Sequence, residues 1–190
     1  MNHRLIVVDL QHDFCHPDGA LYVKGGESII PRISGIIPHF DETIFTVDFH
    51  PINHCSFDIN GGTWPIHCVE YTLGASIPFE LIDRANSKRD FFRKGTLSNL
   101  EEYGAFRDDL IVDTDEYYIV EDIKRQDSDY VICGIAGDYC VLETIKNLLK
   151  LVPKERVFVF MEGIVSIDGG TKLYDFVKEN NLKIYQDGSL

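Results

Sequence analysis

Short apolar runs are spread along the chain and are separated by amphipathic segments. The runs are rich in β-branched and aromatic residues and mostly lack the polar alternation of a half-exposed strand. Such runs are typical of strands that are buried on both faces, as in a parallel sheet. The pattern predicts strands at Arg4–Asp9, Thr43–Asp48, Tyr117–Val120, Tyr130–Gly134, Val157–Met161 and Leu182–Tyr185.

Three segments between these runs have the apolar spacing of amphipathic helices. Ser28 is predicted to cap the first, with Pro31 in its first turn, where the missing N–H of proline does no harm. Asp138 is predicted to cap the second, which runs to about Lys150, and the third spans Thr171–Glu179. Strands that alternate with helices predict an α/β fold, arranged as a three-layer sandwich.

The segment from His50 to Asn99 has a different character from the rest of the chain. It is rich in turn residues and aromatics, and its periodicity is weak. We expect long functional loops with short helices there, because binding residues concentrate on such loops. The total length of 190 residues suits one compact domain over residues 1–190.

Composition narrows the classes of partner. The chain has 18 basic and 31 acidic residues, a net charge of −13, which repels nucleic acid, so a neutral or cationic small molecule fits better. No stretch approaches the roughly 18 apolar residues of a membrane span, and the N-terminal run is too short for a signal peptide. Five cysteines without a CxxC pair indicate free thiols in a reducing cytosol. We expect a cytoplasmic protein that binds neither nucleic acid nor membrane; the sequence leaves its oligomeric state open, a homo-oligomer included.

Acidic residues stand where two predicted strands end. Asp9 and Asp48 each close an apolar run, and the segment Gly134–Cys140 follows another. In open α/β sheets, ligands bind outside the carboxyl ends of the strands, so these three segments are expected to converge. Either acid alone is also typical of a residue that merely starts a turn. The prediction of a site therefore depends on the whole constellation.

A candidate metal site follows Asp48. In an extended segment, Asp48 and His50 point to the same side, and His54 and His67 come soon after. Mixed carboxylate and imidazole ligands suit Zn²⁺, Fe²⁺ or Mn²⁺ and do not suit Ca²⁺. A single histidine is more often a surface residue, and we interpret the histidines that lack such company as structural. These are His3, His12, His16 and His39.

A candidate nucleophile lies at the start of the second predicted helix. Cys140 follows a buried strand and a short turn, and a helix N-terminus lowers the pKa of a thiol and offers N–H groups to an oxyanion. The alternative is an inert buried cysteine, which describes Cys133 well. Asp9 is a candidate proton acceptor, and Lys94 is a candidate cation that could equally be a solvated surface charge.

Several segments together resemble one known family. VVDLQHDFC, VDFHPINHCSF, TWPIHCVEYTLGA, RKGTL and GIAGDYCV occur in that order between residues 5 and 141. They resemble the nicotinamidase branch of the isochorismatase-like cysteine hydrolases. The resemblance implies a six-stranded parallel sheet between helices and hydrolysis of nicotinamide to nicotinate and ammonia through a cysteine thioester.

The resemblance also implies roles for individual residues. The catalytic triad would be Asp9, Lys94 and Cys140, and the ligands of one divalent ion, zinc before iron or manganese, would be Asp48, His50 and His67, with His54 added in some relatives. Phe14 and Trp64 would sandwich the pyridine ring, with Tyr103 near the pocket. A cis peptide between Ile135 and Ala136 would aim the Ala136 N–H into an oxyanion hole beside that of Cys140.

The chain departs from this family pattern at two places. Glu70 and Tyr71 stand where Gln-Gly is usual, and Glu70 is expected to add a negative charge near the site. Gly137 replaces a common Thr. Two other interpretations stay open: an amidohydrolase of the same superfamily that acts on a different carboxamide or carbamoyl compound, and a metal-binding or redox-sensing protein without enzymatic activity.

Overall fold

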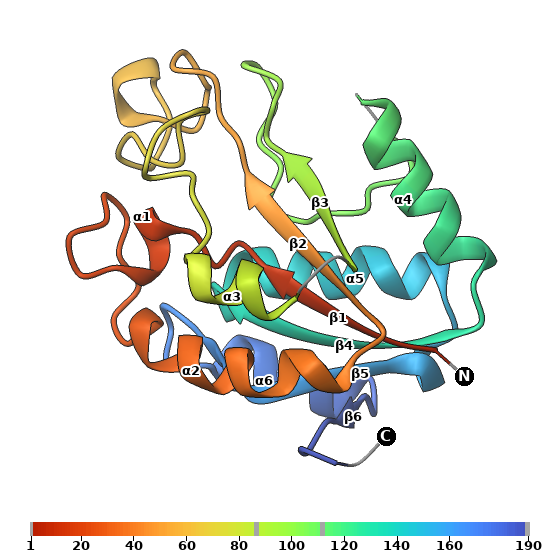
Figure 1. Cartoon of the computed structure of the whole chain (residues 1–190). Helices are drawn as coiled ribbons and strands as arrows, with labels where there is room; N and C mark the ends of the chain where they lie inside the picture. Colours follow the sequence, from red (N-terminus) through yellow and green to blue (C-terminus); the bar gives the residue numbers. More distant parts are fainter. Residues whose placement is uncertain (1, 86–87, 111–112, 189–190) are drawn as a thin grey trace.

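One parallel sheet organises the molecule. The computed structural model describes residues 2–85, 88–110 and 113–188. Within these residues, the strands form a single six-stranded sheet in the order β3-β2-β1-β4-β5-β6, with every neighbouring pair parallel (Figure 1). The strands are β1 (Asn2–Val8), β2 (Glu42–Asp48), β3 (Arg89–Lys94), β4 (Ser128–Ile135), β5 (Val157–Val165) and β6 (Lys183–Ile184).

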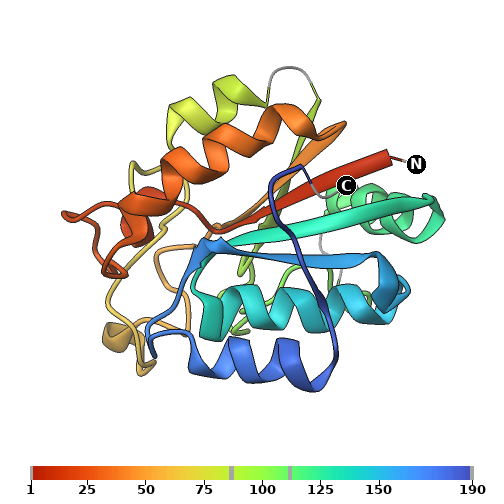
Figure 2. The same cartoon turned by 90° about the horizontal axis from the view of Figure 1, so that it is seen from below.

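Helices cover both faces of the sheet, which confirms the predicted three-layer α/β sandwich. Figure 2 shows α2 and α3 on one face and α5 and α6 on the other. The helices are α1 (His12–Cys15), α2 (Gly26–Ile36), α3 (Phe79–Arg84), α4 (Thr114–Arg125), α5 (Leu142–Leu151) and α6 (Thr171–Glu179). None of the helices in the described part of the chain combines the length and apolar character needed to cross a membrane.

Strand β1 shows why the apolar runs lack alternation. Leu5 and Val7 pack into the core cluster on the α2 side, whereas Ile6 and Val8 pack into the cluster on the α5 side. All four side chains are fully buried. Because successive side chains of a strand point to opposite faces, a strand covered on both faces needs apolar residues at every position.

Two predictions about strands are wrong. The run Tyr117–Val120 lies in α4, where Val120 and Ile123 face the core and Tyr118 is exposed. The spacing of the buried residues is helical, so the apolar residues of this run lie on two faces of a helix. The second error concerns β3, a strand that lies in the segment predicted to form loops. It is an edge strand rich in charge, and this composition hides it from an apolar pattern.

The starts of two helices also differ from the prediction. Helix α2 begins at Gly26, and Ser28 lies inside it, where its hydroxyl donates to the Gly25 carbonyl at 2.6 Å. Pro31 therefore lies beyond the first turn, and its missing N–H leaves one helical hydrogen bond unmade. Asp138 does not cap α5, because it lies in a π-helical turn over Gly137–Val141 that precedes this helix. The third helix, α6, has the predicted bounds.

Candidate active site

The candidate residues converge at the carboxyl edge of the sheet. Asp9 follows the end of β1, while Asp48 and Lys94 end β2 and β3 and are register partners. Cys140 lies in the π-helical turn that follows β4. Loops between residues 49 and 78 rise beyond this edge (Figure 1). Parallel strands thus bring four residues from distant parts of the sequence to one place.

Lys94 lies at the centre of this group. Its Nζ forms an ion pair with Asp9 Oδ2 at 2.8 Å, a hydrogen bond with Asp48 Oδ1, and a contact of 3.8 Å with Cys140 Sγ. The Lys94 and Asp9 side chains are fully buried. The second Asp9 oxygen accepts a 2.6 Å hydrogen bond from the Thr46 hydroxyl. A buried cation is thus compensated by two carboxylates and lies within reach of a thiol.

Burial affects the pKa of all three residues of the predicted triad, Asp9, Lys94 and Cys140. Burial lowers the pKa of Lys94, but Asp48 and Asp9 outweigh it and raise that pKa well above its usual value, so the ammonium stays charged. Burial raises the pKa of Asp9 and of the Cys140 thiol, and in both cases the Lys94 charge opposes the rise. The pKa of the thiol is thus raised, and not lowered as its place near a helix N-terminus predicted, because desolvation is the largest cause. The resting sulfur therefore keeps its proton and needs an adjacent acceptor.

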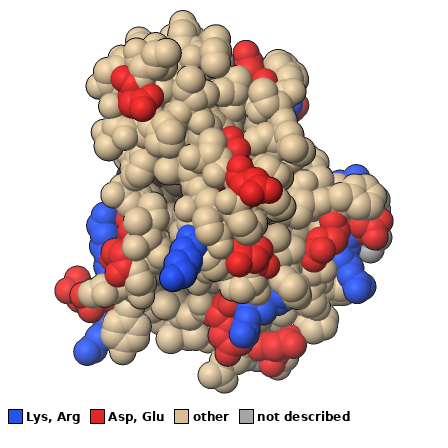
Figure 3. All heavy atoms as spheres, turned by 90° about the vertical axis from the view of Figure 1, so that its left-hand side faces the viewer, with Lys and Arg blue, Asp and Glu red and all other residues tan. Residues whose placement is uncertain are grey.

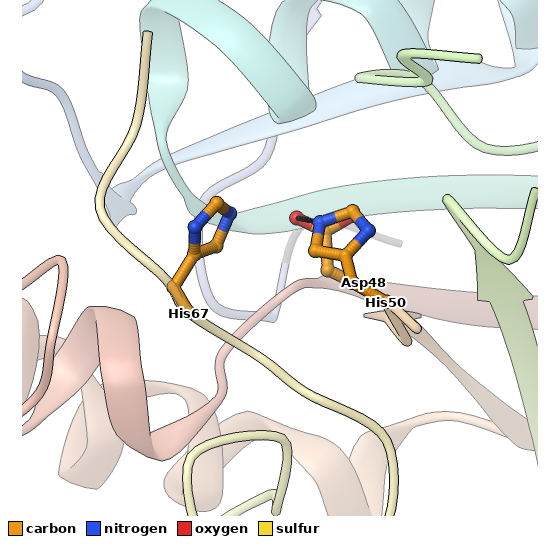
Figure 4. A group of neighbouring side chains, drawn as sticks. All are labelled: Asp48, His50 and His67. Carbon is orange, nitrogen blue, oxygen red and sulfur yellow. Dashed lines mark ion pairs between the residues drawn. The ribbon is translucent and has the colours of Figure 1, made fainter. Parts of the chain in front are cut away.

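Three residues form a cluster suited to a metal ion. Asp48, His50 and His67 each offer a ligand atom, and these atoms all lie within 4.8 Å of one another (Figure 4). The Nδ1 of His50 lies 2.8 Å from the Gly95 carbonyl, and the Nδ1 of His67 lies 2.7 Å from the Pro65 carbonyl. Because a carbonyl only accepts, each Nδ1 carries a hydrogen, which leaves Nε2 as the ring atom that can bind a metal. This outer-shell arrangement is typical of metal-binding histidines. The Nε2 of His50 lies 3.6 Å from Asp48 Oδ2, and although burial lowers the pKa of His50, Asp48 opposes this effect and raises it.

The chemistry of the donor set fits a transition metal. One carboxylate and two imidazoles match the ligands that Zn²⁺ and its neighbours accept, and three protein ligands leave positions for water or substrate. Burial lowers the pKa of His67, which favours the neutral ring that binds a metal. The cluster and the Lys94 centre share Asp48.

His54 is not a member of this cluster. Its ring stacks on that of His50 with 4.1 Å between centroids, but its Nδ1 lies 2.7 Å from the Ser56 hydroxyl and its Nε2 lies 3.0 Å from the Leu100 carbonyl. Both ring nitrogens therefore have protein partners. Burial lowers the pKa of His54 to about 4, so the ring is neutral near pH 7. The geometry favours three protein ligands rather than four.

A pocket opens onto the sulfur of Cys140 and onto the cluster of Asp48, His50 and His67. All three predicted aromatics, Phe14, Trp64 and Tyr103, line it. Trp64 Nε1 donates to the Tyr103 hydroxyl at 3.1 Å, which fixes both rings. The remaining predicted residues at the pocket wall are Asp48, His67, Ala136 and Cys140. Aromatic walls with a few polar groups suit a flat aromatic ligand.

Sequence reasoning missed part of this pocket. Tyr139 lies in the wall, and its ring packs edge to face with that of Trp64, with 5.4 Å between the ring centroids. Its place next to Cys140 in the sequence is the signal that could have identified it. Ile167 also lines the pocket, from a loop that shows no motif. Glu70, in contrast, is exposed and lies outside the wall. Besides Asp48, the acidic residue at the wall is Glu101, and burial raises the pKa of its carboxyl.

Two further residues, also unpredicted, hold the site in place. The Gln11 amide donates to the Asp48 carbonyl at 2.8 Å and accepts from the Asp48 N–H at 2.8 Å, so it fixes the backbone of this residue at both ends. Glu102 accepts the Gly95 N–H through its carboxylate at 3.0 Å, and its carbonyl accepts from Lys94 at 3.3 Å. These contacts position Asp48, a candidate metal ligand, and Lys94, and neither Gln11 nor Glu102 lines the pocket.

The turn before Cys140 has the predicted backbone. The Ile135–Ala136 peptide is cis, which confirms that prediction. Gly134 has φ +124°, and a Cβ there would lie 2.0 Å from the Val8 carbonyl oxygen. Only glycine fits at this position, because both the backbone conformation and the neighbouring strand exclude a side chain. The turn closes with a 3.1 Å hydrogen bond from Val141 N–H to the Ala136 carbonyl.

The fold and the site together define the class of protein. The Isochorismatase domain matches residues 3–151, and the chain therefore belongs to the isochorismatase family. The chain is 30% identical to the nicotinamidase of Saccharomyces cerevisiae, over 95% of this chain and 97% of that protein. It is also similar to solved structures. Pyrazinamidase of Pyrococcus horikoshii in complex with zinc has a TM-score of 0.80 at 31% identity and covers 98% of this chain and 99% of its own. PnC1 from L. infantum in complex with nicotinate has a TM-score of 0.83 at 29% identity, and the match covers 100% of this chain and 94% of that chain.

Proposed function

We propose that this chain is a nicotinamidase, a single domain over residues 1–190 that hydrolyses nicotinamide to nicotinate and ammonia in NAD salvage. One observation carries the proposal: the sulfur of Cys140, with Lys94 beside it, opens onto the same aromatic pocket as Asp48 and His67. The relatives support it, because proteins similar to the chain include nicotinamidases and pyrazinamidases.

In this proposal, Asp9 serves as the general base. It takes the thiol proton of Cys140 as the sulfur attacks the carboxamide carbon, and Lys94 stabilises the charges that form between them. The oxyanion of the tetrahedral intermediate accepts hydrogen bonds from the backbone N–H groups of Ala136 and Cys140. Asp9 then gives the proton to the departing ammonia, which leaves a thioester. Asp9 next deprotonates a water that cleaves the thioester, and the sulfur regains its proton.

The aromatic residues supply positioning. Phe14, Trp64 and Tyr103 hold the pyridine ring so that the carboxamide carbon lies over the sulfur, which converts the attack into an intramolecular-like step. Asp48, His50 and His67 would hold one divalent ion, zinc before iron or manganese. When bound, such an ion supplies a Lewis acid for the ring nitrogen and for water.

We further propose a small-molecule enzyme of the cytoplasm that binds neither nucleic acid nor membrane. The five cysteines are free thiols, which suits a reducing compartment. The net charge of −13 disfavours nucleic acid, and acidic and basic side chains are interspersed on the face in Figure 3, where the described residues form no continuous basic patch. A homo-oligomer is compatible with this proposal.

The experiment combines a substrate panel with a metal assay. Purified protein should release ammonia from nicotinamide and not from an N-carbamoyl amino acid, and Cys140→Ala should abolish the release. A preference for the carbamoyl compound would favour the alternative, a related amidohydrolase with a different substrate. Bound metal without any ammonia release would favour a non-enzymatic protein.

A further inference from the structure

The loop between β5 and α6 carries a residue to the mouth of the pocket. Ile167 lies in this loop and lines the pocket beside Tyr139 and Cys140. Of the described residues that line the pocket, only Ile167 is exposed, with 52% of its surface accessible to solvent. A side chain that both lines a cavity and faces solvent lies where the cavity opens. Ile167 is therefore part of the rim.

The position of Ile167 depends on Asp138, two residues before the nucleophile. The Asp138 carboxylate is buried, and it accepts the backbone N–H of Ile167 at 2.8 Å and that of Asp168 at 3.2 Å. Hydrogen bonds to an ionised acceptor are stronger than neutral ones. The Asp138 carboxylate thus holds the loop through these two hydrogen bonds and does not cap a helix. It ties the rim to the turn that holds Cys140.

Two more contacts fasten the loop to the same turn. Lys172 donates to the Asp138 carbonyl at 3.0 Å and lies 5.3 Å from the centre of the Tyr139 ring. Gly137 lies so close to the loop that a Cβ would lie 2.1 Å from the Ser166 hydroxyl. The loop and the turn are thus packed together, and these contacts fix the place of Ile167 at the rim.

We propose that Ile167, held by the Asp138 carboxylate, is the size filter of the pocket and limits which aromatic carboxamides reach Cys140. This inference rests on the proposed function, since it concerns the substrate range of the same pocket. A single six-membered ring passes the rim, whereas a fused bicyclic ring meets the Ile167 side chain. Asp138 acts through Ile167 and is a positioning residue.

The test compares nicotinamide with quinoline-3-carboxamide, which carries a second fused ring. Ile167→Ala should raise the ratio of kcat/KM for the larger amide to that for nicotinamide by about 10-fold, mainly through KM. Asp138→Asn keeps an acceptor oxygen but loses the charge, so it should raise the same ratio by about 3-fold. If Asp138→Asn does not fold, a graded series at position 167 gives the same test. The ratio of kcat/KM values should be highest for Ile167→Ala and should then fall in the order Ile167→Val, wild type, Ile167→Phe.

Matched controls separate the rim from general effects. Ile184 lies on β6 and is 51% exposed, so Ile184→Ala removes the same side chain at the same exposure away from the pocket. Asp113 also accepts a backbone N–H, that of Asp115 at 3.0 Å, and Asp113→Asn weakens such a bond at the start of α4. Neither control should change the ratio. If Ile167→Ala also leaves it unchanged, or alters both substrates by one common factor, the size filter is wrong.

A binding measurement distinguishes failure of this inference from failure of the proposed function. Trp64 is the single tryptophan and lines the pocket, so its fluorescence reports ring binding without turnover. Quinoline-3-carboxylate should bind Ile167→Ala about 10-fold more tightly than wild type, with nicotinate changed by less than about 2-fold. This selectivity with no ammonia release in wild type would reject the proposed activity and retain the filter. Equal changes for both acids would reject the filter, whatever the activity.

Discussion

Gly95→Ala perturbs the predicted metal ligand His50 through a single added methyl group. Gly95 has φ +65°, and a Cβ there would lie 2.4 Å from His50 Cε1 and 2.6 Å from its Nδ1. Carbon atoms in contact lie about 3.5–4.0 Å apart, so the ring has to move by about 1 Å. The same glycine accepts the His50 Nδ1–H at 2.8 Å, and this bond sets the orientation of the ring.

The expected magnitude has two parts. Placing alanine in the left-handed region costs about 1–2 kcal/mol of folding free energy. Disturbing the outer-shell partner of a metal-binding histidine lowers metal affinity by about 10–100-fold. We therefore expect Gly95→Ala to lose affinity for zinc by this factor and to unfold at lower denaturant concentration.

The assay is zinc affinity by competition with a chelator, together with the free energy of unfolding from denaturant titration. Gly188→Ala is the matched control, because Gly188 has φ +78° and its Cβ would meet nothing within 4 Å. The control should show the backbone cost and unchanged zinc affinity. Equal zinc affinity in both variants would refute the argument that Gly95 positions His50.

Three further substitutions test the role of His54, the protonation of Glu116 and the contact between Thr46 and Asp9. His54→Gln should retain one zinc per chain by elemental analysis, since both ring nitrogens of His54 already have protein partners, whereas His67→Gln should lose it; loss in both would restore His54 as a ligand. Burial raises the pKa of Glu116 from 4.5 to about 7, so the wild-type protein loses stability as the pH rises through 7. Glu116→Gln should therefore be more stable than wild type at pH 8, by up to about 3 kcal/mol, but not at pH 4.5. A difference in stability that does not depend on pH would contradict this. Thr46→Val removes the hydroxyl that donates to Asp9 at 2.6 Å and should lower kcat about 10-fold with KM unchanged; an effect on KM alone would show that Thr46 does not orient the base.

The strands that sequence reasoning found are those whose burial leaves a continuous apolar run. β1 and β4 are central strands with helices on both faces, and their continuous apolar sequence identifies them as strands. β3 escaped because an edge strand tolerates charge, and its Arg89, Asp90 and Arg93 interrupt the pattern. In α4, Tyr117–Val120 has the letters of a strand, and only the long-range packing of Val120 and Ile123 reveals the helix.

The candidate site follows the same division. Asp9, Asp48, Lys94 and Cys140 lie at strand ends, so the topology of a parallel sheet brings them together once the strands are ordered. No comparable rule predicts the place of residues that act through contacts between side chain and backbone, such as Gln11. Ile167 enters the wall from a loop whose path is decided by tertiary hydrogen bonds, and no local pattern encodes it.

In the proposed mechanism, the sulfur of Cys140 attacks the amide and carries the acyl group. Acid quenching of the enzyme during turnover of nicotinamide, followed by peptide mass spectrometry, measures this directly. We expect a nicotinoyl group on the peptide that contains Cys140, and none on that peptide in Cys140→Ala. Steady release of ammonia from a wild-type enzyme whose Cys140 peptide is never acylated, at any quench time, would contradict it.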